Sequence, residues 1–201
     1  MNNPGIREPR QKRSIEKKER IVEAGCRLFF QKGFHNTNTA EIAKEAGVST
    51  GIVYNYFNDK KDIFLEVVKR YSDSLMAPMY EKLATIEEIE DLSQMLYLFI
   101  DIAIKSHTIS KPAHEEMLAM SHSDDDVREI FYQFDIENTK KIVDIISKMG
   151  LNPTNPNEKV HIAMGMIENL CHEIVYHRHE SMDYELMKKE VVTAVINMIN
   201  S

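Results

Sequence analysis

The chain has 201 residues, of which 43% are hydrophobic, 28% charged and 8% aromatic. This composition fits one or two compact domains with an apolar core, and it excludes a disordered polymer. The formal net charge is −7, from 25 Lys and Arg residues against 32 Asp and Glu residues. Taken as an average, that charge argues against a nucleic-acid partner.

The charge is unevenly distributed along the chain, however. Residues 1–70 contain 14 Lys and Arg against 9 Asp and Glu, a net +5, whereas residues 71–201 contain 11 against 23, a net −12. Such an asymmetry indicates a nucleic-acid-binding segment attached to an acidic domain.

Two cysteines, Cys26 and Cys171, lie far apart with no His or Cys at metal-ligand spacing, so we interpret them as small buried side chains in a reducing compartment. The N-terminus has no apolar signal region, and no run of 18 uncharged apolar residues occurs. We therefore expect a cytoplasmic protein that does not span a membrane.

The first predicted helix begins at Ser14 as its N-cap and ends at Gly33. Apolar or small residues recur along it at the spacing of one buried helical face, for example at Ile21 and Leu28. Residues 1–13 form a basic segment, which we interpret as a flexible arm. A simple tail is favoured over an arm that enters a minor groove of DNA.

Two short helices follow. Asn38 and Glu41 have the spacing of a capping box for the first of them, which ends at Gly47. Ser49 is a good N-cap for the second, and the uncharged run to Phe57 continues it. Two short helices joined by Gly-Val-Ser predict a helix-turn-helix.

A fourth helix is predicted from about Lys60, with Pro78 interrupting it, so residues 14–75 form a four-helix unit. Beyond it, further helical patterns run to the C-terminus, the last two at about 157–179 and 183–199. Gly150, Pro153 and Pro156 mark the sharpest break between them. Strand-like alternation is absent, so the predicted fold class is all-α.

A family resemblance now becomes visible in Gly33-Phe34, Thr37, Ile42-Ala43, Gly47-Val48-Ser49, Tyr54-Asn55-Tyr56-Phe57 and Lys60 to Phe64. This ordered set resembles the TetR family of bacterial transcription regulators. The resemblance covers residues 14–74, with the helix-turn-helix at about 37–57. It implies a DNA-binding domain over 14–74 and a helical domain over 75–201 that binds a small-molecule effector and forms a homodimer through its last two helices.

Helix packing gives the predicted recognition helix two faces. Val48, Val53 and Phe57 are expected to be buried. This leaves Thr50, Tyr54 and Asn55 directed outward, where they can reach a major groove. Gly47 suits a left-handed turn position. Ala43 and Gly51 are expected to let the two helices cross closely.

The resemblance also implies individual DNA contacts. Recognition-helix contacts are expected at Thr50, Gly51 and Asn55, and phosphate contacts at Tyr54, Tyr56 and Lys60. Thr39 is a further expected contact, at a helix N-terminus whose amides also favour phosphate. Thr37 is expected to cap the second helix instead of touching DNA. Simpler interpretations remain open: Tyr56 as a core residue, Tyr54 and Asn55 as solvated surface, and Lys60 as a first-turn surface lysine.

The acidic region is rich in methionine, because all methionines other than Met1 lie beyond residue 70. Their flexible side chains suit an adaptable apolar pocket. The candidate lining residues are Met95, Phe99, Met117, Met120, Phe131 and Phe134, although each is also consistent with an ordinary core position. An acidic, methionine-rich domain suits a neutral or cationic lipophile more than a polyanion, but surface carboxylates are the favoured explanation of the whole charge.

A polar stripe on the helix at 157–179 carries His161, Glu168, His172 and His179. Only Glu168 and His172, four residues apart, are close enough to share an ion, and two ligands do not make a site. We therefore predict no metal and no cofactor, and favour solvated or dimer-interface polar residues.

Together these features predict a DNA-binding repressor that binds a palindromic operator as a dimer and is released by a small-molecule effector. No catalytic residues are predicted, since no nucleophile with a placed base and no phosphate-binding loop is identifiable. An activator or an effector-independent DNA-binding protein remains an alternative. A second alternative is a helical small-molecule-binding or catalytic protein that has a vestigial helix-turn-helix.

Overall fold

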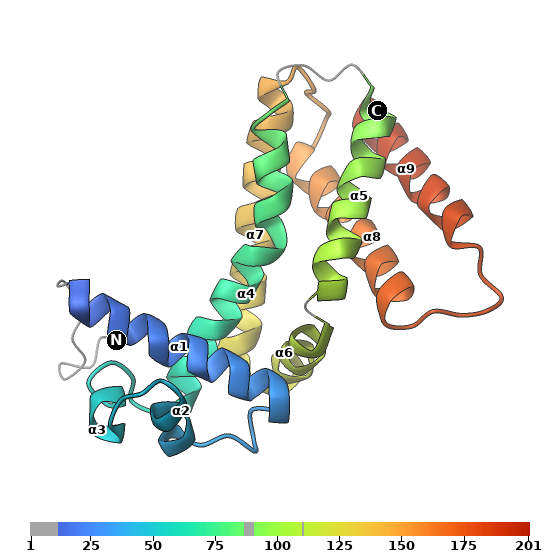
Figure 1. The fold of residues 1–201 in the computed structure, drawn as a ribbon. Helices are drawn as coiled ribbons and strands as arrows, with labels where there is room; N and C mark the ends of the chain where they lie inside the picture. The colour runs from blue at the N-terminus through green and yellow to red at the C-terminus, as the bar shows by residue number, and fades with distance from the viewer. Residues whose placement is uncertain (1–11, 87–90, 110) are drawn as a thin grey trace. The chain divides into compact units, whose positions relative to one another are not determined.

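The computed structural model describes residues 12–86, 91–109 and 111–201, and every regular element in these ranges is an α-helix. The helices are α1 Lys12–Lys32, α2 Thr39–Glu45, α3 Thr50–Val53, α4 Lys60–Leu83, α5 Leu92–Ile109, α6 Lys111–Ser123, α7 Asp125–Lys148, α8 Pro156–Val175 and α9 Tyr184–Asn200 (Figure 1). The all-α prediction is confirmed. None of the described helices is long and apolar enough to cross a membrane.

The chain divides into two compact units. The first comprises Met1–Tyr71 with Pro112–Ile130, and the second comprises Ser72–Lys111 with Phe131–Ser201. The sequence predicted two consecutive domains that meet at residues 74 and 75, whereas the contacts group 112–130 with the N-terminal helices. The predicted arm at 1–13 falls mostly outside the described residues, and its last two residues begin α1.

Ion pairs and hydrogen bonds join the two segments of the first unit. The Phe34 backbone N–H donates to Glu116 Oε1 at 2.6 Å. The Lys61 ammonium pairs with Asp124 at 2.8 Å and with Asp126 at 2.7 Å. These contacts hold the α6 segment and the start of α7 to the loop after α1 and to the start of α4.

The core of the first unit is formed by apolar faces of α1 to α4. The predicted stripe on α1 is buried at Ile21 and Ala24, and Leu28 is half-buried. The helices are also tied at their surface, because Arg70 of α4 donates two hydrogen bonds to the Glu19 carboxylate of α1, at 2.5 and 2.9 Å. A bidentate contact of this kind fixes both distance and orientation.

The predicted start of α1 and the predicted interruption of α4 are wrong. Helix α1 begins at Lys12, so Ser14 lies inside it, and its hydroxyl is 2.8 Å from the Tyr56 hydroxyl instead of capping the helix. Helix α4 continues through Pro78 to Leu83. Proline removes only one backbone hydrogen bond, and Pro78 is exposed, so the surrounding turns still form. The end of α1 at Gly33 is confirmed, with φ +83°.

The second unit is built around α5, α8 and α9, which can be followed side by side in Figure 1. Its buried core consists of Leu96, Ile100, Ala163, Leu170, Val192 and Val195. Cys171 of α8 is a free and fully buried thiol, and burial raises its pKa to about 12. Helix α8 ends at Val175, earlier than predicted, so His179 lies in the following loop and not on the α8 polar stripe.

Candidate nucleic-acid interface

The start of α2 is fixed by a reciprocal pair of hydrogen bonds. Asn38 Oδ1 accepts from the Glu41 backbone N–H at 3.0 Å, and Glu41 Oε2 accepts from the Asn38 N–H at 3.1 Å. The predicted capping box is therefore confirmed. Lys32 pairs with the same carboxylate at 2.7 Å, and together with the Asn38 N–H it holds the pKa of Glu41 below its ordinary value.

The turn between α2 and α3 needs a left-handed residue. Gly47 occupies it with φ +63°, as predicted, and its N–H donates to the Lys44 carbonyl at 3.1 Å. Ser49 is the N-cap of α3 through its backbone, without a side-chain hydrogen bond. The α-helical part is only four residues long, but hydrogen-bonded turns continue the segment to Phe57, whose N–H donates to the Val53 carbonyl at 3.0 Å.

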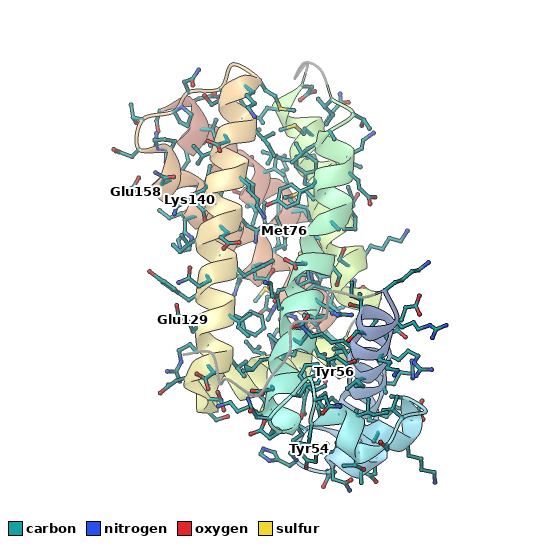
Figure 2. All side chains as sticks on the ribbon, turned by 90° about the vertical axis from the view of Figure 1, so that its left-hand side faces the viewer. Tyr54, Tyr56, Met76, Glu129, Lys140 and Glu158 are labelled. Carbon is teal, nitrogen blue, oxygen red and sulfur yellow. The ribbon has the colours of Figure 1, made fainter. Side chains whose placement is uncertain are left out.

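The α3 segment separates into a buried and an exposed side as predicted. Val53 and Phe57 are buried, and Val48 is half-buried. Tyr54 is 52% exposed, and Figure 2 shows it at the outer surface of the first unit. Asn55 is also exposed. We call this group the α3 face; it comprises the exposed residues Gly51, Tyr54 and Asn55 together with Thr50, which was expected to be directed outward but is half-buried.

Gly51 does not have the packing role expected of it. A Cβ atom built on Gly51 would meet no atom within 4 Å, so this glycine does not allow a close crossing of α2 and α3. The close approach in the first unit occurs instead at Gly25 of α1, where an added Cβ would lie 2.7 Å from Ile63 Cγ2. Gly51 thus contributes to the exposed surface and not to the core.

Tyr56 and Thr39, two further expected DNA contacts, are half-buried. The Tyr56 hydroxyl lies 2.8 Å from Ser14 Oγ, so the ring links the α3 segment to α1, beside which Figure 2 shows it. Thr39 is the first residue of α2, where backbone N–H groups point outward. Tyr56 therefore makes a structural contact within the first unit, and the phosphate contact expected of it stays a prediction.

Lys60 makes contacts that the sequence did not reveal. Its ammonium donates to the carbonyl oxygens of Phe34 at 2.8 Å and Thr37 at 2.9 Å, and it lies 4.4 Å from the centre of the Phe34 ring. The Thr37 hydroxyl donates to the Gly33 carbonyl at 2.9 Å and does not cap α2. The loop between α1 and α2 is thus held by side chains that satisfy its backbone carbonyls.

The six candidate pocket residues are divided between the two units. Met117 and Met120 are buried in the first unit. Phe99 is buried in the second unit, where Met95, Phe131 and Phe134 are half-buried. A shallow, open depression of about 470 Å³ lies on the loop before α9, lined by Arg178 and Glu180 to Glu185, and none of the six lines it.

The sequence revealed only part of one polar cluster in the second unit. Glu168 Oε1 lies 3.1 Å from His172 Nε2 and 3.1 Å from Nε2 of His107, which comes from α5. The Glu168 side chain is half exposed, and the partial removal of its carboxyl from water opposes ionisation, but the hydrogen bonds from both histidines outweigh this and hold its pKa well below the ordinary value. Burial likewise opposes protonation of His107, yet Glu168 leaves the pKa of that imidazole raised.

Comparison with known proteins identifies the N-terminal helices. Residues 21–67 match the family model described as bacterial regulatory proteins, tetR family. The regulator HbdR of Aromatoleum sp. (strain CIB) is 41% identical over 59 residues, which are 29% of this chain and 26% of that protein. The transcriptional activator FasR of Mycolicibacterium smegmatis is 32% identical over 84 residues, 42% of this chain and 36% of that one.

The similarity in sequence thus spans only about a quarter to a third of these relatives. Similarity in fold extends further. The fatty acid degradation regulator FadR of Bacillus halodurans has a TM-score of 0.66 at 16% identity, covering 94% of this chain and 97% of that one. Both parts of the chain therefore have the same helical fold as that regulator. At 16% identity the match shows the fold and nothing about function.

Proposed function

Because the chain belongs to the tetR family of bacterial regulatory proteins, a family of regulators and not of enzymes, we propose that it is a dimeric repressor that binds a palindromic operator. The observation that carries this proposal is the α3 face. It exposes an amide and a phenol on a segment whose opposite side, at Val53 and Phe57, is anchored in the core. A major groove admits one such helix.

Each exposed group on the α3 face has a distinct expected role. Asn55 presents an amide that can accept and donate to an adenine edge, so it contributes to sequence discrimination. We expect Tyr54, which is exposed, and the N-terminal turn of α2 at Thr39 to contact phosphates, which position the protein without reading sequence. The surplus of positive charge in residues 1–70 supports the same interface.

The direct test is binding of the purified chain to DNA from upstream of its own gene, measured by fluorescence anisotropy beside random DNA. We expect Asn55→Ala to reduce discrimination between the two by about tenfold or more, since a bidentate base contact contributes roughly 1–3 kcal/mol. Asn36→Ala is the matched control, because Asn36 is an exposed asparagine of the same unit that is not part of the α3 segment. Equal affinity of the wild type for specific and random DNA would overturn the proposal.

A homodimer through α8 and α9 is the proposed assembly. Ile162 of α8 and Leu186 of α9 are 52% and 51% exposed, and Met182 in the loop between these helices is 54% exposed. Large apolar side chains on two adjacent helices favour a protein contact. Ile162→Glu with Leu186→Glu should yield monomers in sedimentation experiments. Tyr132→Glu, at a residue of α7 that is 58% exposed, should leave the dimer intact.

Release by an effector completes the proposed function. A ligand that binds one conformation of the second unit more tightly would change the separation of the two recognition helices, which must stay near ~34–36 Å to engage successive major grooves. Met95, Phe99, Phe131 and Phe134 are the candidate contacts in that unit. Compounds that shift the melting temperature should also shift DNA affinity; compounds that bind without altering it would contradict this step.

Activation of transcription is the second candidate, since FasR is an activator. The two modes differ in the position of the operator. A repressor site overlaps the promoter, whereas an activator site lies beside it. Deletion of the gene followed by measurement of transcripts from the bound promoter separates them: transcripts should rise for the proposed repressor and fall for an activator.

A further inference from the structure

The contact between His107 and Glu168 brings two hydrogen-bond acceptors together. His107 Nδ1 is 2.8 Å from the Ala103 carbonyl oxygen, which can only accept, so Nδ1 carries the ring hydrogen. In the neutral imidazole the lone pair is therefore on Nε2, and that atom is 3.1 Å from Glu168 Oε1. An ionised carboxylate also only accepts. Either a proton or a metal cation must lie between the two atoms.

His172 approaches the same carboxylate oxygen from one helical turn further along α8, with Nε2 at 3.1 Å. The candidate ligand atoms of His107, Glu168 and His172 all lie within 4.8 Å of one another. Ligand atoms held at about 2.0–2.1 Å around a tetrahedral ion are separated by about 3.3 Å. The observed spacing is thus close to that of a coordination shell, and small side-chain shifts suffice to admit an ion.

We propose that His107, Glu168 and His172 form a binding site for a divalent transition-metal ion of the zinc class. Two imidazoles and one carboxylate are a ligand set that favours Zn²⁺, Co²⁺ or Ni²⁺, whereas Ca²⁺ and Mg²⁺ prefer oxygen ligands alone. The sequence predicted no site because it placed only two of these ligands together.

The surroundings of the site orient its ligands. The Ala103 carbonyl fixes the tautomer and the ring of His107, which is the support usually given to a metal-bound histidine. The Tyr176 hydroxyl donates to the His107 carbonyl at 3.2 Å, and its ring packs edge-on against His172 at 5.2 Å. His107 is buried, whereas the Glu168 side chain is 50% exposed. The exposed side gives an ion access from solvent.

The site is separate from the proposed dimer face and from the α3 face. Glu168 lies about 120° around α8 from Ile162, at ~100° per residue, so it is not on the apolar dimer face. All three ligands belong to the second unit, whereas the α3 face belongs to the first. A variant that no longer binds metal can therefore still be tested for DNA binding. A variant that no longer binds DNA can likewise still be tested for metal binding.

Titration of the full, chelator-treated chain with Co²⁺ tests the proposal. We expect visible absorption bands of a low-coordinate site that saturate at a single ion per chain and are displaced by Zn²⁺. Glu168→Gln keeps a hydrogen-bond acceptor for the histidines but removes the charge, and His172→Ala removes a ligand. Each should weaken Co²⁺ binding by at least about 10-fold. His161→Ala is the matched control, because it removes a histidine of α8 outside the cluster.

Circular dichroism of each variant verifies that it is folded before titration. Two results would overturn the proposal. One is a wild-type chain that shows no Co²⁺ bands and takes up no Zn²⁺ in competition with a chromogenic chelator. The other is Glu168→Gln and His172→Ala binding Co²⁺ as tightly as His161→Ala, since the three side chains would then form only a hydrogen-bonded cluster.

Discussion

Gly25 of α1 lies so close to Ile63 of α4 that a Cβ atom on Gly25 would be 2.7 Å from Ile63 Cγ2. Gly25→Ala should therefore destabilise the first unit. Alanine favours a helix over glycine by roughly 1 kcal/mol, but overpacking a core costs about 1–3 kcal/mol, and Ile63 is fully buried. Gly165→Ala is the control, because a Cβ there meets nothing within 4 Å. Thermal unfolding should show a lower midpoint for Gly25→Ala and an equal or higher one for Gly165→Ala. Equal midpoints would contradict the close packing.

Gly51→Ala should separate folding from DNA binding. Because an added Cβ at Gly51 meets no protein atom, the melting temperature should be unchanged or slightly raised. The same methyl group projects from the α3 face, where it would occupy space needed by DNA. We expect operator affinity to fall by about tenfold, equivalent to about 1.4 kcal/mol. Full operator affinity in this variant would place the DNA interface elsewhere on the first unit.

Lys60→Ala should act mainly on stability. The ammonium donates to the Phe34 and Thr37 carbonyls, and removal of a donor to partly buried carbonyls costs about 1–3 kcal/mol. The melting temperature should fall while the dependence of DNA affinity on salt concentration stays the same. A phosphate contact predicts the reverse, with a salt slope lower by about one unit and unchanged stability. Lys44→Ala is the control variant, because it removes one positive charge from the exposed surface of α2.

Stability should fall in acid partly through Asp124. Its pKa is lowered by Lys61, and by the backbone N–H groups of Val127 and Asp126 at the start of α7. Since the folded pKa lies below the unfolded value of about 3.9, this contribution is complete above that value and is lost as the pH falls through the folded pKa. Asp124→Asn should lower the melting temperature at pH 7. The difference from the wild type should shrink towards pH 3; a constant difference would mean that the charge is not involved.

The features that the sequence predicted best are those that depend on residues close together in the chain. The capping box of Asn38 and Glu41 and the left-handed turn at Gly47 each involve residues within four positions, and both are present. The burial of Val53 and Phe57 beneath exposed Tyr54 likewise follows from the period of one helix. These short-range features are the ones that shape the α3 face.

Contacts between distant parts of the chain were not predictable from the same patterns. Lys60 meets carbonyls that precede it by more than 20 residues, and His107 meets Glu168 across 61 positions. No local periodicity links such residues, because their approach depends on how helices pack. The wrong ends at Ser14 and Pro78 have a related cause, since tertiary packing extends a helix past a local stop signal.

The contact of Glu116 with the Phe34 backbone also has a consequence for the order in which the protein forms during translation. The first unit takes Pro112–Ile130 from beyond a stretch of about 40 residues that belongs to the second unit. A ribosome therefore has to synthesise the chain past residue 130 before the N-terminal helices can acquire all their partners. A gene fragment that stops after α4 would encode the recognition segment but not its complete support.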